Sequence, residues 1–152
     1  MRRAESLLLA ALTLAAVPTP ARACTVSSAG VAFGAYNPRS TGAGNGTGTI
    51  SVSCHPSVSA PVVTLSTGGS GSYATRRMTS GAWLLNYNLY TNSARTIIWG
   101  DGSGGSVSQT LSGGSVSGGQ RRFSRTIYGR IPALQNVGAG SYGDTIIMTV
   151  TF

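Results

Sequence analysis

Few side chains in this sequence could carry out acid–base chemistry. Of 152 residues only three are acidic, and beyond Glu5 these are Asp101 and Asp144, accompanied by one histidine and no lysine. General acid–base catalysis, a carboxylate pair or an activated serine each needs a suitably placed titratable partner. Nothing in the sequence indicates that Asp101 and Asp144 form such a pair. We therefore expect a protein that is not an enzyme, with no catalytic residues and no cofactor.

Two local motifs resemble ligand sites at first sight. His55 lies between Cys54 and Pro56, where a strand would end in a turn, and no second histidine or acidic cluster supplies further metal ligands. The segment WGDGSGG (99–105) lacks the Lys-Ser/Thr of a phosphate-binding loop and the Asp/Asn series of a calcium loop. We interpret this segment as a tight Asp-Gly turn and expect no metal site.

The first 23 residues have the organisation of a secretory signal peptide. Arg2 and Arg3 precede an apolar stretch from Leu7 to Val17, and Ala21-Arg22-Ala23 is typical of a cleavage site. The apolar stretch is too short to span a bilayer, and no later segment is longer, so we expect an exported, soluble protein with no membrane span. Twin-arginine export is an alternative, disfavoured by the plain context of Arg2-Arg3.

The two cysteines, Cys24 and Cys54, are most simply explained as a disulfide, because exported domains commonly contain them. Closing a loop of about 30 residues would stabilise the fold by roughly 3–4 kcal/mol in the chain-entropy model. Cleavage after Ala23 would alternatively expose Cys24 as a lipid-anchored first residue. Arg22, bulky and charged, does not suit a lipoprotein signal.

The positive charge of the chain comes entirely from arginine. Residues 24–152 contain eight Arg and two Asp, which gives a net charge of +6. Such a surface could meet anionic cell-surface polymers. Because the arginines are dispersed and no nucleic-acid motif accompanies them, we expect a solvated basic surface and no nucleic-acid partner.

The pattern along residues 24–152 predicts one all-β domain. The chain contains 22 glycines, and apolar residues recur at spacing two between Gly, Asn, Pro and Ser breaks, as in a sandwich or barrel. The predicted strands are 24–36 (kinked at Gly30), 48–54, 61–68, 83–91, 95–100, 106–111, 121–131 and 143–152. The Gly/Ser-rich segment 102–119 is interpreted as a hairpin with glycine-rich turns, although a flexible linker is the obvious alternative.

Several stretches, taken in order, resemble one known family. They are CTVSSAGVAFGAYNP (24–38), GTGTISVSC (46–54), ATRRM (74–78), LNYNLYT (85–91), WGDG (99–102), YGRIP (128–132) and GSYGDTIIMTVTF (140–152). Together they resemble the spore coat protein U domain, which is found in subunits of Csu-type, archaic chaperone-usher pili. The resemblance implies an immunoglobulin-like β-sandwich that lacks its last strand and is completed by a donor strand, a form of β-augmentation.

The resemblance also implies where the donor strand would bind. One side of an apolar groove would be formed by Val31 and Phe33 of the first strand. The other side would be formed by the last strand, through Ile146, Met148, Val150 and Phe152. A slip of one residue in this assignment would exchange Ile146 for Ile147. Such an uncovered apolar edge would be an aggregation hazard.

The implied partners are a periplasmic pilus chaperone, an outer-membrane usher and neighbouring pilus subunits, and the implied location is the periplasm in transit and then the cell surface. Cleavage after Ala23 would leave no donor segment before Cys24, which favours a place at the adhesive tip with a role in attachment and biofilm formation. The alternative is a secreted, self-complete spore-coat or matrix protein in which segment 102–119 supplies the missing strand.

Overall fold

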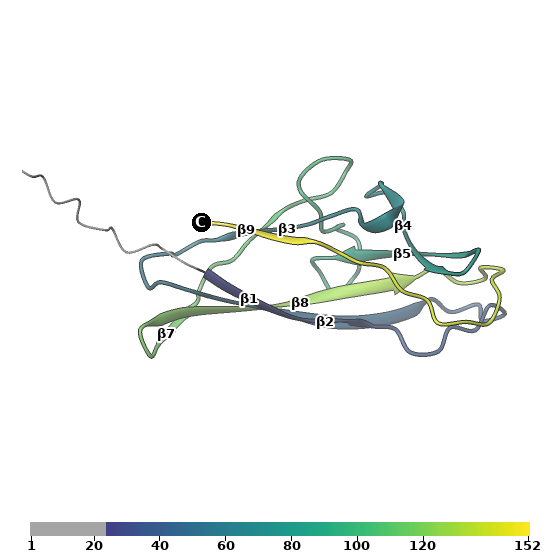
Figure 1. The fold of residues 1–152 in the computed structure, drawn as a ribbon, viewed down its shortest axis with the longest axis horizontal. Coiled ribbons are helices and arrows are strands. Elements are labelled where there is room, and N and C mark those ends of the chain that lie inside the picture. The colour runs from purple at the N-terminus through teal and green to yellow at the C-terminus, as the bar shows by residue number, and fades with distance from the viewer. Residues whose placement is uncertain (1–23) are drawn as a thin grey trace, which may run out of the picture.

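The computed structural model describes residues 24–152 as two β-sheets packed face to face (Figure 1). The predicted signal peptide, residues 1–23, lies outside the described residues. Nine strands and one short 3₁₀ turn, Gly68–Ser70, account for the regular structure of the described part. None of its helical segments is long and apolar enough to cross a membrane. The all-β prediction is confirmed.

The larger sheet is antiparallel, with strand order β1-β2-β8-β5-β4. Its strands are β1 (Cys24–Ala32), β2 (Gly44–Cys54), β8 (Gln120–Ile131), β5 (Trp83–Tyr90) and β4 (Arg76–Ser80), and the short β7 (Ser115–Ser117) pairs with the beginning of β8. The β2 and β8 strands pair along eleven residues, from Gly44 opposite Ile131 to Cys54 opposite Arg121. This long ladder forms the floor of the domain, and β1 occupies one edge of it.

The smaller sheet contains β6 (Gln109–Thr110), β3 (Val62–Leu65) and β9 (Met148–Thr151) in the order β6-β3-β9. The central strand, β3, is antiparallel to both neighbours. β9 therefore has a paired edge toward β3 and a second edge that pairs with no strand of the described chain.

The core lies between the sheets and follows from strict alternation along the strands. In β2, Gly48, Ile50, Val52 and Cys54 are buried, whereas the alternating residues Thr49 and Ser51 are exposed. Other strands contribute buried residues from both sheets: Val63, Leu65, Met78, Leu85, Tyr87, Leu89, Phe123, Ile127 and Ile131. Trp99 fills the centre of the core, and its indole N–H donates to the carbonyl of Val63.

A fully buried arginine joins the two sheets. The guanidinium of Arg76 donates two hydrogen bonds to the Ser66 carbonyl just after β3, one to the Trp99 carbonyl and one to the Asn88 side chain on β5. Asn88 in turn donates to the carbonyls of Tyr73 and Ala74. Because buried polar groups are costly unless they are satisfied, this network stabilises one particular arrangement of the sheets.

Several strand predictions were wrong in detail. Residues 95–100 form no strand, since Arg95 has a left-handed backbone (φ 57°) and the segment makes only isolated bridges, from Ile98 to Tyr90 of β5 and from Trp99 to Val107. The strand expected at 106–111 is reduced to Gln109–Thr110, and the terminal strand begins only at Met148. Strand β4 was missed because Arg76-Arg77 has the composition of a polar loop, although Arg76 is a core residue.

The Gly/Ser-rich segment is part of the domain and is not a linker. Its first half contains β6, and its second half contains β7, which turns directly into β8 at Gly118 and Gly119. Both glycines have positive φ (58° and 72°), as a two-residue primed hairpin turn requires. β6 pairs with β3 on the side away from β9, so this segment does not cover the open edge of β9.

Candidate binding groove

The open edges of the two sheets lie next to each other. β1 is the last strand of the larger sheet and β9 the last strand of the smaller one, and Figure 1 shows the start of β1 and the carboxyl terminus at the same end of the sandwich. Residues from both edges line a hollow of about 230 Å³, and a second hollow of about 680 Å³ continues beyond Val31 and Phe33. We call these two hollows together the β1–β9 groove.

Four of the six predicted groove residues come together there. Val31 and Phe33 are half-buried and line both hollows, while Ile146 and Met148 line the smaller one from the opposite side. Val150 is half-buried against the core further along β9 but lines neither hollow. Phe152 follows the end of β9 and is 56 % exposed.

The faces of the last segment alternate as the sequence pattern predicts. Ile146, Met148 and Val150 pack against the core, whereas Ile147 is 67 % exposed. Ile147 is nevertheless fixed through its backbone, since its N–H donates to the Ser66 hydroxyl and its carbonyl accepts from the Ser66 N–H.

Three glycines that the sequence interpretation overlooked let β1 enter the groove. The β1–β2 register shifts between Ala29 and Ala32, and Val31 is pressed onto the inner surface of the larger sheet. A Cβ on Gly46 or Gly48 would lie 3.0 Å from a methyl of Val31, and one on Gly129 would lie 2.6 Å from it. Only glycine fits such a close approach, so the available signal was the spacing of Gly46, Gly48 and Gly129 at otherwise core-facing strand positions.

Further apolar residues of the groove, and of the open edge of β1 beside it, were also missed. Val26 lies opposite the buried Val52 and so has the inward orientation, yet it is 43 % exposed because it stands on the open edge. The larger hollow is lined by Tyr36, Met78, Leu85, Val137 and Tyr142 among others. Val26 could have been identified, because it is two residues from Cys24 on the same strand and so shares its face. The loop residues of the larger hollow follow no periodic pattern in the sequence that could have identified them.

One carboxylate lies at the groove. Asp144 lines the smaller hollow, accepts from the Tyr87 hydroxyl at 2.7 Å, and accepts from the backbone N–H groups of Gly69 and Thr145. Burial first, and then the hydrogen bond to Asp144, raise the pKa of Tyr87 well above its usual value. These bonds attach the start of the last segment to β5 and to the 3₁₀ turn.

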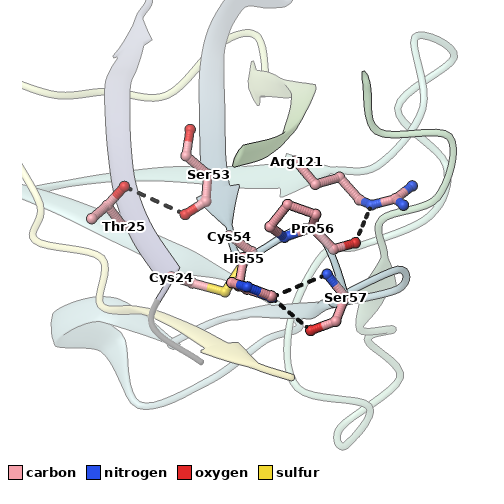
Figure 2. Close-up of a disulfide and its surroundings, with 8 residues drawn as sticks. All are labelled: Cys24, Thr25, Ser53, Cys54, His55, Pro56, Ser57 and Arg121. Carbon is pink, nitrogen blue, oxygen red and sulfur yellow. Dashed lines mark hydrogen bonds between the residues drawn. A yellow bond between two sulfur atoms is a disulfide. The ribbon is translucent and has the colours of Figure 1, made fainter. Parts of the chain in front are cut away.

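A disulfide between Cys24 and Cys54 fixes the beginning of β1 to the end of β2, as predicted (Figure 2). The neighbouring strand residues add a hydrogen bond from the Thr25 hydroxyl to the Ser53 carbonyl. Just beyond Cys54, the Arg121 guanidinium donates to the Pro56 carbonyl and closes the turn against β8. The edge strand β1 is thereby held at its first residue.

The remaining candidates for chemistry are engaged in turns. His55 is exposed, and its Nδ1 contacts the hydroxyl and the N–H of Ser57 (Figure 2). Asp101 accepts from the N–H and the hydroxyl of Ser103, which lowers the pKa of its carboxyl. Within residues 24–152, no group of three or more His, Cys, Asp or Glu side chains could hold a metal ion.

Comparison with solved structures supports the assignment of an immunoglobulin-like fold. The chain superimposes with a TM-score of 0.61 and 20 % identity on a chain in the crystal structure of the CsuC–CsuE chaperone–tip adhesion subunit pre-assembly complex, from the archaic chaperone-usher Csu pili of Acinetobacter baumannii. The match covers 85 % of this chain and 39 % of the solved one, so this protein spans about two fifths of that chain.

Sequence comparisons identify the family. Protein U of Myxococcus xanthus is 34 % identical over 147 residues, a match that covers 86 % of this chain and 78 % of that protein. The model of the Spore Coat Protein U domain matches residues 10–149, which begins within the predicted signal peptide and extends into β9. This match covers most of the sequence, and the protein belongs to the Spore Coat Protein U domain family.

Proposed function

We propose that this protein is a strand-accepting subunit of a chaperone-usher surface pilus. A periplasmic chaperone would first fill the β1–β9 groove with one of its strands, and after passage through an outer-membrane usher a neighbouring subunit would replace it. The protein would then reside in the fibre at the cell surface. The predicted signal peptide, residues 1–23, would direct its export.

The observation that carries the proposal is that apolar side chains at the open edges of β1 and β9 are directed toward the core side but remain exposed to solvent. Val26 points toward the core side of the sheet, as its pairing with Val52 requires, and still exposes 43 % of its surface. Phe152 is similarly exposed at the end of the opposite edge. An inserted strand could pair with free backbone groups of either edge and cover these side chains.

The stabilisation expected from an inserted strand is large enough to decide whether the domain folds stably. Fully burying a large apolar side chain contributes roughly 1.5–3 kcal/mol, so covering several of them would contribute roughly 5–10 kcal/mol. The net stability of a whole domain is of the same order. The chain is therefore expected to depend on a partner strand for its stability.

A matched pair of variants on β9 tests the proposal. Met148 faces the core side and lines the smaller hollow, whereas Thr149 faces away, so Met148→Glu places a charge at the groove and Thr149→Glu places the same charge outside it. We expect co-purification with the cognate chaperone to be lost for Met148→Glu and retained for Thr149→Glu. Equal binding by both variants would contradict strand acceptance at this edge.

The tip is the position we propose along the fibre, with a role in attachment and biofilm formation. The support is that the solved structure with the same fold contains a chaperone and a tip adhesion subunit. Immunogold labelling of pili should then mark fibre ends. Labels distributed along the shafts would contradict the tip position without affecting strand acceptance.

A spore-coat or matrix component is the second candidate, and the match to the model of the Spore Coat Protein U domain supports it. The two functions differ in whether the domain needs a partner strand. We would purify residues 24–152 from a periplasm that lacks any pilus chaperone and measure thermal unfolding. A soluble monomer with a cooperative, high-temperature transition would favour the coat protein, whereas aggregation reversed by the chaperone would favour the pilus subunit.

A further inference from the structure

The outer face of the larger sheet carries rows of hydroxyl groups across three strands. Ser27 on β1 lies opposite Ser51 on β2, which lies opposite Ser124 on β8. These serines are exposed, because their strand neighbours Val52 and Phe123 point into the core. Adjacent strands are about 4.8 Å apart, so the row presents regularly spaced hydrogen-bonding groups.

Beside these serines the surface is hollowed. A depression of about 530 Å³, which we call the serine trough, lies over this row and is bounded by the loop 112–114 and the first residue of β7, Ser115. Its volume is in the range of small-ligand sites. The loop is fixed at one rim by Arg125, whose guanidinium donates to the carbonyls of Ser112 and Ser124.

Arg122 gives the trough its charge. This arginine is exposed, stands between Ser53 and Ser115 in the sheet register, and donates no side-chain hydrogen bond to any residue of the described chain. Its planar guanidinium therefore keeps its donors available for a carboxylate or sulfate, which it can bind in bidentate fashion.

No negative charge competes for this arginine within the trough. The acidic residues of the described chain are Asp101 and Asp144, and their carboxylates are engaged by Ser103 and by Tyr87, outside the trough lining. Hydroxyl groups that both donate and accept suit the hydroxyls of a sugar. Nucleic acid fits less well, because Phe123, the aromatic residue of the lining, is buried and offers no ring for base stacking.

We propose that the serine trough binds an acidic sugar unit of an anionic polysaccharide, with Arg122 holding the carboxylate or sulfate and the serines holding ring hydroxyls. The trough and the β1–β9 groove use opposite faces of β1. A subunit that has received a donor strand therefore keeps the trough open, and the proposal does not depend on the proposed function.

Binding of polygalacturonate tests this proposal, with dextran as the neutral polymer and single-stranded oligodeoxythymidine as the nucleic acid. The protein is used in the form in which it is purified, alone or with a chaperone. We expect Arg122→Gln to weaken polygalacturonate binding about tenfold or more in calorimetry, as loss of a hydrogen bond to a charged group would do. The matched control is Arg77→Gln, which removes the same charge from the exposed face of β4 and should change the affinity less than twofold.

Three results would overturn the proposal. They are absence of polygalacturonate binding, equal losses in Arg122→Gln and Arg77→Gln, and tighter binding of the oligodeoxythymidine than of polygalacturonate. Arg122→Lys adds a further criterion, since it retains the charge without the guanidinium fork and should bind between the wild type and Arg122→Gln. Circular dichroism of each variant should match the wild type, because Arg122 is exposed and outside the core.

Discussion

Val31 lies directly over Gly129, and the absent side chain of the glycine leaves the space that the valine fills. A Cβ on Gly129 would lie 2.6 Å from Cγ1 of Val31 and equally close to the ring of Phe33. The two residues that separate the hollows of the β1–β9 groove are therefore positioned by a residue on the third strand of the sheet. The shape of the groove depends on β8 as much as on its own edges.

Gly129→Ala should consequently disturb the groove. The added methyl would force Val31 and Phe33 outward, and overpacking of this kind costs about 1–3 kcal/mol. We expect a lower urea midpoint and weaker chaperone binding. Gly143→Ala is the matched control outside the groove lining, since a Cβ there would meet nothing within 4 Å, and it should leave both quantities nearly unchanged. A tolerated Gly129→Ala would show that β1 can move without loss.

Replacing Arg76 should destabilise the whole domain. Arg76→Met removes the donors for the Ser66 and Trp99 carbonyls and the Asn88 side chain, and each buried group left without a partner costs about 1–3 kcal/mol. Arg76→Lys should not restore stability, because a single ammonium cannot reproduce the planar fork. Urea unfolding of both variants checks this, with Arg77→Met, exposed on the same strand, as the control. Full stability of Arg76→Lys would contradict the role of the fork.

The disulfide should stabilise the fold by constraining the unfolded chain. Cys24 and Cys54 are separated by 30 residues, for which the chain-entropy model gives about 3–4 kcal/mol. The double variant Cys24→Ala/Cys54→Ala should lose about this amount in denaturant unfolding. Addition of a reductant should destabilise the wild type and leave the double variant unaffected. A reductant effect on the variant would indicate a cause other than this bond.

Sequence patterns were most informative where alternation and burial coincide. The faces of Ile146, Met148 and Val150 follow directly from period two, and the pairing of two cysteines had one simple solution. Arg76 could not be recognised, because its burial depends on carbonyls contributed by segments distant in the chain. The glycines at 46, 48 and 129 look like weak strand residues until the path of β1 above them is known.

The local sequence pattern also could not predict how much of the last segment, residues 143–152, forms a paired strand. Residues 143–152 have a strong strand signal, yet only Met148–Thr151 form a ladder with a neighbouring strand, and Gly143 makes an isolated bridge to Thr79. β-propensity describes a half-buried, pleated surface, and pairing additionally requires a partner strand. Beside Ile146 there is no partner strand, because this residue lines the open groove. The part of the segment that lies beside it is therefore ordered through Asp144 and Ser66 rather than through a ladder.

Tyr87 should make stability fall at alkaline pH. Burial, and then its hydrogen bond to Asp144, hold the pKa of Tyr87 in the folded protein above its usual value, whereas an unfolded tyrosine ionises near pH 10. Above about pH 10 the unfolded state therefore binds fewer protons than the folded state, and the free energy of unfolding decreases by up to about 1.4 kcal/mol per pH unit from this group. Below that pH its contribution is fully present.

Tyr87→Phe removes this pH dependence together with the hydrogen bond to Asp144. The variant should therefore be less stable than the wild type at pH 8. It should lose less of its remaining stability than the wild type between pH 9 and pH 11. Urea unfolding across this range measures both quantities, and equal losses in the two proteins would mean that Tyr87 ionises as readily in the fold as in the unfolded chain.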